Sequence, residues 1–233
     1  MNYGVVTDHP ELIDLNYSTG GRPGNADWNH INSIDYNEEL DQILLSVRGN
    51  SEIWVIDHST ITAQAAGHTG GNSGRGGDLL YRWGNPQAYD AGNGADQQLF
   101  VQHDAQWIPS GYPGEGNILV FNNGTGRPDG NYSSVDEIIP PLDGSGNYTL
   151  GAGSAYRPVG PIWAYVADTP AHFYAERISG AQRLPSGNTL ICDGPSGLFF
   201  EVTPEGETVW GYDYDGEVFR VTRYGSDYPG LPS

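Results

Sequence analysis

Two histidines occupy matching places in a repeated stretch of the chain. His30 opens the segment 30–36 and His103 opens the segment 103–108, and each segment reads as the first strand of a repeat. Because equivalent positions in successive repeats face the same way, we expect both imidazoles to point into one shared pocket. Imidazoles can act there as nucleophiles, as bases or as ligands of an anion. The pair is therefore the first candidate for a catalytic site.

Two arginines accompany these histidines. Arg48 comes after the second strand of the first repeat, and Arg127 comes after the second strand of the second repeat, in a Gly-rich loop. A guanidinium binds an anionic group through two parallel hydrogen bonds. Two imidazoles and two guanidinium groups would make an electropositive pocket inside a chain of net charge −19, suited to a phosphate or sulfate ester. The alternative is that both arginines lie on the surface and balance its acidic charge.

The elements that must position these side chains are the strands of a repeat. Each repeat runs strand, turn, strand, strand and a final strand with a tryptophan, which is Trp83, Trp163 or Trp210. The repeats cover residues 28–84, 100–166 and 177–213. Four-stranded sheets repeated without intervening helices predict an all-β chain and a β-propeller, with a β-sandwich as the alternative. The 34 glycines and 16 prolines also argue against a helical bundle.

The number of repeats bears on the domain organisation. Three four-stranded blades do not close a ring, because propellers generally have at least four blades. We therefore predict that residues 1–233 form a single propeller domain or part of one, with three to four blades present. Residues 216–225 begin a further strand, and residues 1–27 could supply one or two more. Open blade edges would expose unpaired backbone groups, so self-association through these edges is expected.

Composition excludes several classes of function. All ten basic residues are arginines, and the absence of lysine excludes Schiff-base enzymes, pyridoxal phosphate enzymes and the lysine of a phosphate-binding loop. The acidic charge argues against nucleic acid as a partner. No apolar run is long enough to span a membrane. Cys192 is the only cysteine, so neither an internal disulfide nor a cysteine metal cluster can form.

The composition and short motifs of the sequence also lead to predictions about cofactors, cellular location and glycosylation. We predict no cofactor and no metal site, because the acidic turns 143–147 and 213–217 lack the full EF-hand pattern. The acidic composition indicates an extracellular or periplasmic protein whose signal was removed or lies upstream. Four glycosylation sequons are present, and they begin at Asn16, Asn123, Asn131 and Asn147.

Four segments carry a resemblance to a known family. They are residues 27–36, 102–107, 117–127 and 180–190. Together these segments resemble the bacterial arylsulfotransferases. The resemblance implies a six-bladed propeller enzyme that moves a sulfuryl group from an aryl sulfate to a phenolic acceptor. It also implies that no nucleotide sulfate donor is used and that a histidine is transiently sulfated.

The resemblance implies roles for individual residues. His30 and His103 would bind the sulfuryl oxygens, and Arg127 would stabilise charge on the transferred group. Arg48, Asn32 and Gln102 would contact the substrate. The nucleophilic histidine of the family would fall near residues 178–180, where this sequence has no histidine. The nearest is His172, which is therefore the remaining candidate.

Two other functions fit parts of the sequence. A non-catalytic propeller that binds a partner or assembles with itself would explain the incomplete ring and the missing third histidine. A polysaccharide-binding or polysaccharide-cleaving propeller would use exposed tryptophans and a pair of carboxylates across a cleft.

Overall fold

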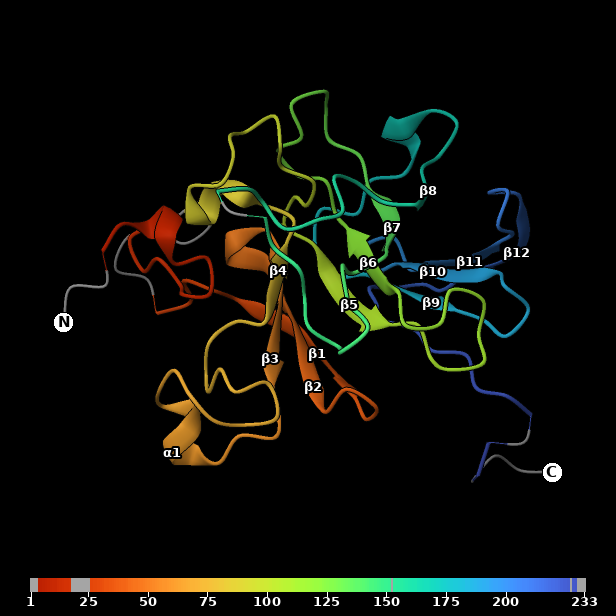
Figure 1. Cartoon of the computed structure of the whole chain (residues 1–233). Coiled ribbons are helices and arrows are strands. Elements are labelled where there is room, and N and C mark those ends of the chain that lie inside the picture. Colours follow the sequence, from red (N-terminus) through yellow and green to blue (C-terminus); the bar gives the residue numbers. More distant parts are fainter. Residues whose placement is uncertain (1–3, 18–25, 152, 227, 230–233) are drawn as a thin grey trace.

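The chain folds into three four-stranded antiparallel sheets that lie side by side (Figure 1). The computed structural model describes residues 4–17, 26–151, 153–226 and 228–229. The architecture is all-β and of the propeller type, which confirms the predicted fold class. Each sheet lies within one of the three predicted repeats.

The strands of each sheet are hydrogen-bonded in sequence order. The first sheet holds β1 (Ile31–Asn37), β2 (Gln42–Val47), β3 (Glu52–Asp57) and β4 (Tyr81–Trp83). The second holds β5 (His103–Trp107), β6 (Ile118–Asn122), β7 (Ser134–Ile138) and β8 (Trp163–Tyr165). The third holds β9 (Gly180–Arg183), β10 (Thr189–Asp193), β11 (Leu198–Val202) and β12 (Thr208–Asp213). Short turns join β1 to β2 and most strands of the third sheet, and allow these neighbours to pair directly, whereas residues 58–80 and 139–162 form long connections before β4 and β8.

Helical structure in the described residues is confined to single turns between strands. These are η1 (Val6–Asp8), η2 (Arg48–Asn50), α1 (Thr62–Ala65), η3 (Pro86–Tyr89) and η4 (Pro170–His172). The described residues before β1 form η1 and turns and contain no strand. The expectation of additional strands there is therefore wrong for the described part of that segment.

The two main apolar cores lie between neighbouring sheets. Strand β6 of the middle sheet contributes side chains to both cores. Ile118 and Val120 pack in the core between the first and second sheets, whereas Leu119 and Phe121 pack in the core between the second and third. Successive side chains of a strand point to opposite faces. The continuous apolar run of β6 therefore reflects a strand that is covered on both faces.

Hydrogen bonds connect the first strands of neighbouring sheets. The Asp35 carboxylate on β1 accepts the Trp107 N–H of β5 at 2.8 Å. One sheet further, the Asp104 carboxylate on β5 accepts the Ala181 N–H of β9 at 3.1 Å. Side chains on each first strand thus bind the backbone of the next, so β1, β5 and β9 lie adjacent along the inner side of the array.

The segment after β12 is hydrogen-bonded to β9 in a similar way to that in which β9 is bonded to β5. The Ser179 N–H donates to the Phe219 carbonyl at 3.0 Å. The side-chain amide of Gln182 accepts the Arg223 N–H at 2.8 Å and donates to the Arg223 carbonyl at 3.1 Å. Residues 219–223 therefore lie beside β9 as β9 lies beside β5, which is where the first strand of a fourth sheet would run.

The closing tryptophans are not all equivalent. Trp163 pairs with Glu137 and Trp210 pairs with Glu201, at the same register position. In the first sheet that position belongs to Tyr81, because Trp83 is two residues further along β4. The predicted tryptophan repeat therefore holds for the second and third sheets only.

Candidate active site

The antiparallel pairing of β1 with β2 brings His30 next to Arg48. His30 directly precedes β1 and has a φ of 44°, and its carbonyl accepts the Arg48 N–H at 3.2 Å. The next N–H, from Gly49, donates to the Asn29 carbonyl at 2.9 Å. A Cβ on Gly49 would lie 2.3 Å from the Trp28 carbonyl oxygen, so only glycine permits this close approach.

His103 opens β5 and is almost completely buried, with 3% of its surface exposed. Its Nδ1 lies 2.7 Å from the side-chain oxygen of Asn123, the residue that follows β6. The Asn123 amide nitrogen donates to the Ala175 carbonyl at 2.7 Å and to the Ile178 carbonyl at 3.0 Å. These two bonds fix the amide orientation, because only its nitrogen can donate. The Asn123 oxygen must then accept a hydrogen bond from His103 Nδ1–H.

The electrostatics relate His103 to Arg48 and His30. The pKa of His103 is lowered to about 4, mainly because burial disfavours the charged ring. The hydrogen bond to Asn123 opposes this effect, and the charges of Arg48 and His30 add to it. A charge shifts a neighbouring pKa over roughly one Debye length, about 10 Å. Arg48 and His30 therefore lie within electrostatic reach of His103, and the electropositive pocket that they would form with it stays a prediction.

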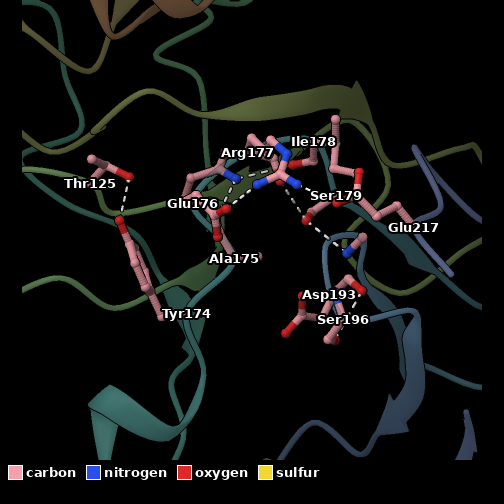
Figure 2. Close-up of polar contacts among 12 residues, drawn as sticks. Thr125, Tyr174, Ala175, Glu176, Arg177, Ile178, Ser179, Asp193, Ser196 and Glu217 are labelled. Carbon is pink, nitrogen blue, oxygen red and sulfur yellow. Dashed lines mark hydrogen bonds and ion pairs between the residues drawn. The ribbon is translucent and has the colours of Figure 1, made fainter.

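The third sheet places Ser179 where the second sheet places His103. The Ser33 hydroxyl accepts the Ala105 N–H as the Asp104 carboxylate accepts the Ala181 N–H, so the equivalent residue of the first sheet is Asn32 and the predicted equivalence of His30 and His103 is wrong by two residues. Arg48, Asn123 and Gly194 each directly follow the second strand of their sheet, and Gly194 donates its N–H to Ser179 Oγ at 3.0 Å. The Ser179 hydroxyl donates in turn to the Arg177 carbonyl at 3.2 Å. Figure 2 shows Ser179 between Arg177 and the turn after β10. Ser179 is fully buried, so its hydroxyl is occupied by the backbone.

Two residues of this region were not predicted from the sequence. The Phe219 ring lies edge-on to His103, with 6.3 Å between ring centroids, and is about half exposed. The second residue is Asp27, whose carboxylate oxygen Oδ2 lies within hydrogen-bonding distance of Nδ1 of His30, at 2.6 Å. The spacing of three residues between Asp27 and His30 was visible in the sequence, whereas nothing local connected Phe219 to a histidine more than a hundred residues earlier.

Arg127 contacts its own loop, the start of β7 and the Phe100 ring. Its Nε donates to the Tyr132 carbonyl at 3.1 Å, and Nη2 donates to the Ser134 hydroxyl at 2.7 Å. The guanidinium also lies over the Phe100 ring at 5.4 Å and the Tyr132 ring at 4.5 Å. These contacts explain the conformation of the β6–β7 loop. The role of Arg127 in charge stabilisation stays a prediction.

The predicted substrate contacts of Gln102 do not fit its position. Its side chain is fully buried, and its amide nitrogen donates to the Glu52 carbonyl at 2.6 Å. Because side chains alternate along a strand, the residue next to His103 faces the first sheet instead of the pocket. Asn32 is partly buried and donates to the Gln102 carbonyl at 2.7 Å, so it also joins the first two sheets.

Two further predictions concern accessibility. His172 is exposed at the end of η4, which follows the outer strand β8 (Figure 1), and its assignment as nucleophile stays a prediction. The sequon at Asn123 is buried, with both amide protons bonded, so the folded protein cannot be glycosylated there.

The described residues contain no group of three or more histidine, cysteine or carboxylate side chains that could hold a metal.

The comparisons identify the family. The arylsulfotransferase (ASST) sequence profile matches residues 13–224, which is most of the chain. The chain belongs to the arylsulfotransferase family. No curated protein shows significant sequence similarity to it. Across the described part of this arylsulfotransferase-family chain, no helix has the length and apolar character needed to cross a membrane.

Solved structures show more distant similarity. A protein of unknown function from Bacteroides caccae is 15% identical over 82% of this chain and 48% of its own, with a TM-score of 0.42. A streptogramin B lyase is 12% identical over 83% of this chain and 44% of its own, with a TM-score of 0.41. BamB from Moraxella catarrhalis is 12% identical over 78% of this chain and 37% of its own, with a TM-score of 0.36. The chain thus spans less than half the length of each of these proteins.

Proposed function

We propose that this protein transfers a sulfuryl group from an aryl sulfate to a phenolic acceptor through a histidine. Membership of the arylsulfotransferase family supports sulfuryl transfer as the general chemistry. The observation that carries the proposal is the effect of the Arg48 and His30 charges on the buried ring of His103, in a chain of net charge −19. The Arg48 guanidinium is the permanent positive charge of this region and matches a singly charged sulfate ester.

The pocket supplies what this transfer requires. Sulfuryl transfer resembles phosphoryl transfer, in which the protein positions the reactants and stabilises charge on the equatorial oxygens. The Arg48 guanidinium offers donors for these oxygens. The partly exposed Phe219 ring beside His103 offers an aromatic surface for the aryl group of the donor or acceptor.

The test is turnover of p-nitrophenyl sulfate in the presence of a phenolic acceptor. We expect release of p-nitrophenol together with formation of the acceptor sulfate, and loss of both in His103→Ala. His58→Ala is the matched control, because His58 is an exposed histidine that pairs with Asp41 on a surface turn. Absence of transfer by the folded wild-type protein would contradict the proposed function.

Self-association is the second candidate function, and one observation favours it. All six residues of the edge strand β12 are exposed, among them Val209, Trp210 and Tyr212. An exposed edge strand with apolar side chains is a template for pairing with a second copy of the chain. Sedimentation analysis tests this: a monomer at micromolar concentration would contradict self-association.

The extracellular or periplasmic location, inferred from the acidic composition, stays a prediction.

A further inference from the structure

We propose that a cavity beside β4, the last strand of the first sheet, binds an aromatic carboxylate. The cavity has a volume of about 280 Å³. It lies between residues 84–98, in the connection from β4 to β5, and residues 154–159, in the connection from β7 to β8. Neither His30 nor His103 lines it. The proposal is therefore separate from sulfuryl transfer and does not depend on that function.

Three buried aromatic side chains form walls of this cavity. They are Trp83, Tyr89 and Tyr156, and each has 5% or less of its surface exposed. Hydrogen bonds hold them in place: the Trp83 indole donates to the Pro158 carbonyl at 2.8 Å, and the Tyr89 hydroxyl accepts the Tyr156 N–H at 3.2 Å. Because these rings are already fixed, a ligand need not order them, which lowers the cost of binding. Aromatic walls of this kind suit a ligand with an aromatic ring.

Arg157 gives the cavity a positive charge, since it lines the cavity and is exposed. Its carbonyl accepts the Tyr81 hydroxyl at 2.9 Å, which holds its backbone against the first sheet. Across the described residues, no hydrogen bond or ion pair of the Arg157 side chain is found. Several other arginines do pair with carboxylates, namely Arg82, Arg177, Arg183, Arg220 and Arg223. A guanidinium without such a partner can offer two parallel hydrogen bonds to the carboxylate of a ligand.

A second guanidinium lies close to the same aromatic wall. Burial raises the pKa of Tyr156, and the charge of Arg75, which is hydrogen-bonded to the Tyr156 side chain, opposes this rise. In the described part of the chain Arg75 also forms no ion pair with a carboxylate. Tyr156 thus contacts one arginine of this kind and directly precedes the other, in a chain of net charge −19. An anion is attracted to this place although the protein as a whole repels it.

Carboxylates near the cavity restrict the charge of the ligand. Asp96 lines the cavity and is exposed, and its Oδ2 accepts the Asn93 N–H at 2.8 Å. The charge of Glu11 also reaches Tyr156. These negative charges favour a ligand with one negative charge over a ligand with two, because like charges repel each other. A carboxylate therefore fits the cavity better than a phosphate monoester.

Calorimetric titration of the full chain with three aryl compounds of similar size tests the ligand class. Phenylacetate carries one negative charge, 2-phenylethanol carries none, and phenyl phosphate carries close to two at neutral pH. We expect phenylacetate to bind at least about tenfold more tightly than either of the others, because only its single charge matches the site. Equal or weaker binding of phenylacetate, or no binding at all, would overturn the proposal.

Two variants locate the bound compound. Arg157→Met should weaken binding of phenylacetate about tenfold and leave binding of 2-phenylethanol unchanged, because only the carboxylate uses the guanidinium. Ala95→Trp places a large ring at an exposed position of the cavity lining and should abolish binding of both compounds. Because both positions are exposed, we expect both variants to unfold at the wild-type temperature. Binding that is unchanged in these folded variants would show that the compound lies elsewhere.

Arg177→Met is the matched control for the loss of one positive charge. Arg177 is an exposed arginine that pairs with Glu176 and Glu217, and its replacement should leave the affinity for phenylacetate unchanged. A loss of affinity in Arg48→Met instead of Arg157→Met would place the compound near His30 and overturn the proposal. Phenylacetate has no sulfuryl group, so this result is obtained whether or not the protein transfers sulfate.

Discussion

Arg220 reaches across β9 to Asp104, and its Nη1 lies 2.8 Å from Asp104 Oδ1. The other carboxylate oxygen of Asp104 accepts the Ala181 N–H of β9. Burial raises the pKa of Asp104, and the contact with Arg220 opposes this rise. The two residues border a cavity of about 190 Å³ on the inner side of the sheets. This ion pair therefore joins the second sheet to the segment that follows the third.

Gly180 makes the contact possible, and its replacement gives the first prediction. A Cβ at this position would lie 2.2 Å from Asp104 Oδ2. We expect Gly180→Ala to lower the free energy of unfolding by about 1–3 kcal/mol, because the crowded carboxylate is already held by Ala181 and Arg220. Urea denaturation measures the effect. Gly211→Ala in β12 is the control, since the nearest atom to its Cβ would be 3.9 Å away. Equal stability of both variants would contradict the prediction.

The second prediction concerns a buried ion pair in the first sheet. Arg82 and Glu52 are both fully buried, and Arg82 Nε donates to Glu52 Oε1 at 2.8 Å. We expect Arg82→Met to cost about 3–5 kcal/mol of unfolding free energy, because it leaves a buried carboxylate without its partner. Thermal or urea unfolding provides the measurement.

The matched control for Arg82 is an exposed arginine. Arg177 forms ion pairs with Glu176 and Glu217 on the surface, as Figure 2 shows. Solvent screens such pairs, so Arg177→Met should cost less than about 1 kcal/mol. A similar cost for both substitutions would show that burial does not govern the contribution of these pairs.

The third prediction is a pH dependence of stability that comes from His103. Its pKa is lowered from an ordinary 6.5 to about 4 in the folded protein. Between these values the unfolded chain binds the proton and the folded chain does not, so stability falls as pH decreases through this window. The full contribution is present above the unfolded pKa and amounts to about 3 kcal/mol.

A variant isolates this contribution from that of the carboxylates. The difference in unfolding free energy between the wild-type protein and His103→Gln should change by that amount between pH 7 and pH 4, in the direction of a relatively less stable wild type at low pH. Urea unfolding at several pH values measures it. A difference that stays constant with pH would contradict the lowered pKa.

The fourth prediction separates the two arginines that the sequence placed in the pocket. Arg48→Met should weaken binding of an aryl sulfate at least about tenfold, because a charged hydrogen bond contributes about 1.5–3 kcal/mol. Arg127→Met should weaken it less, because two of its nitrogens already donate to Tyr132 and Ser134. Binding of p-nitrophenyl sulfate by calorimetry decides between them, and a larger loss in Arg127→Met would return the charge-stabilising role to that residue.

The sequence by itself determined the sheets and the position of the two histidines. Apolar alternation and glycine-rich turns act between residues close in the chain, so strands such as β2 and β6 could be located from their own sequence. His103 opens β5 and His30 directly precedes β1, so the local pattern located both near the start of a first strand. The histidine missing from the third sheet was also visible, since Ser179 stands in that register.

The tertiary structure decided which side chains share the pocket. Arg48 directly follows its strand and lies beside His30, whereas Arg127 lies in a loop and donates to Tyr132 and Ser134. Gln102 is next to His103 in sequence but faces the opposite side of the strand. Phe219 and Arg220 reach the inner strands from the far end of the described chain. Such contacts depend on how whole sheets pack against each other, and packing between distant segments leaves no periodic signal in the sequence.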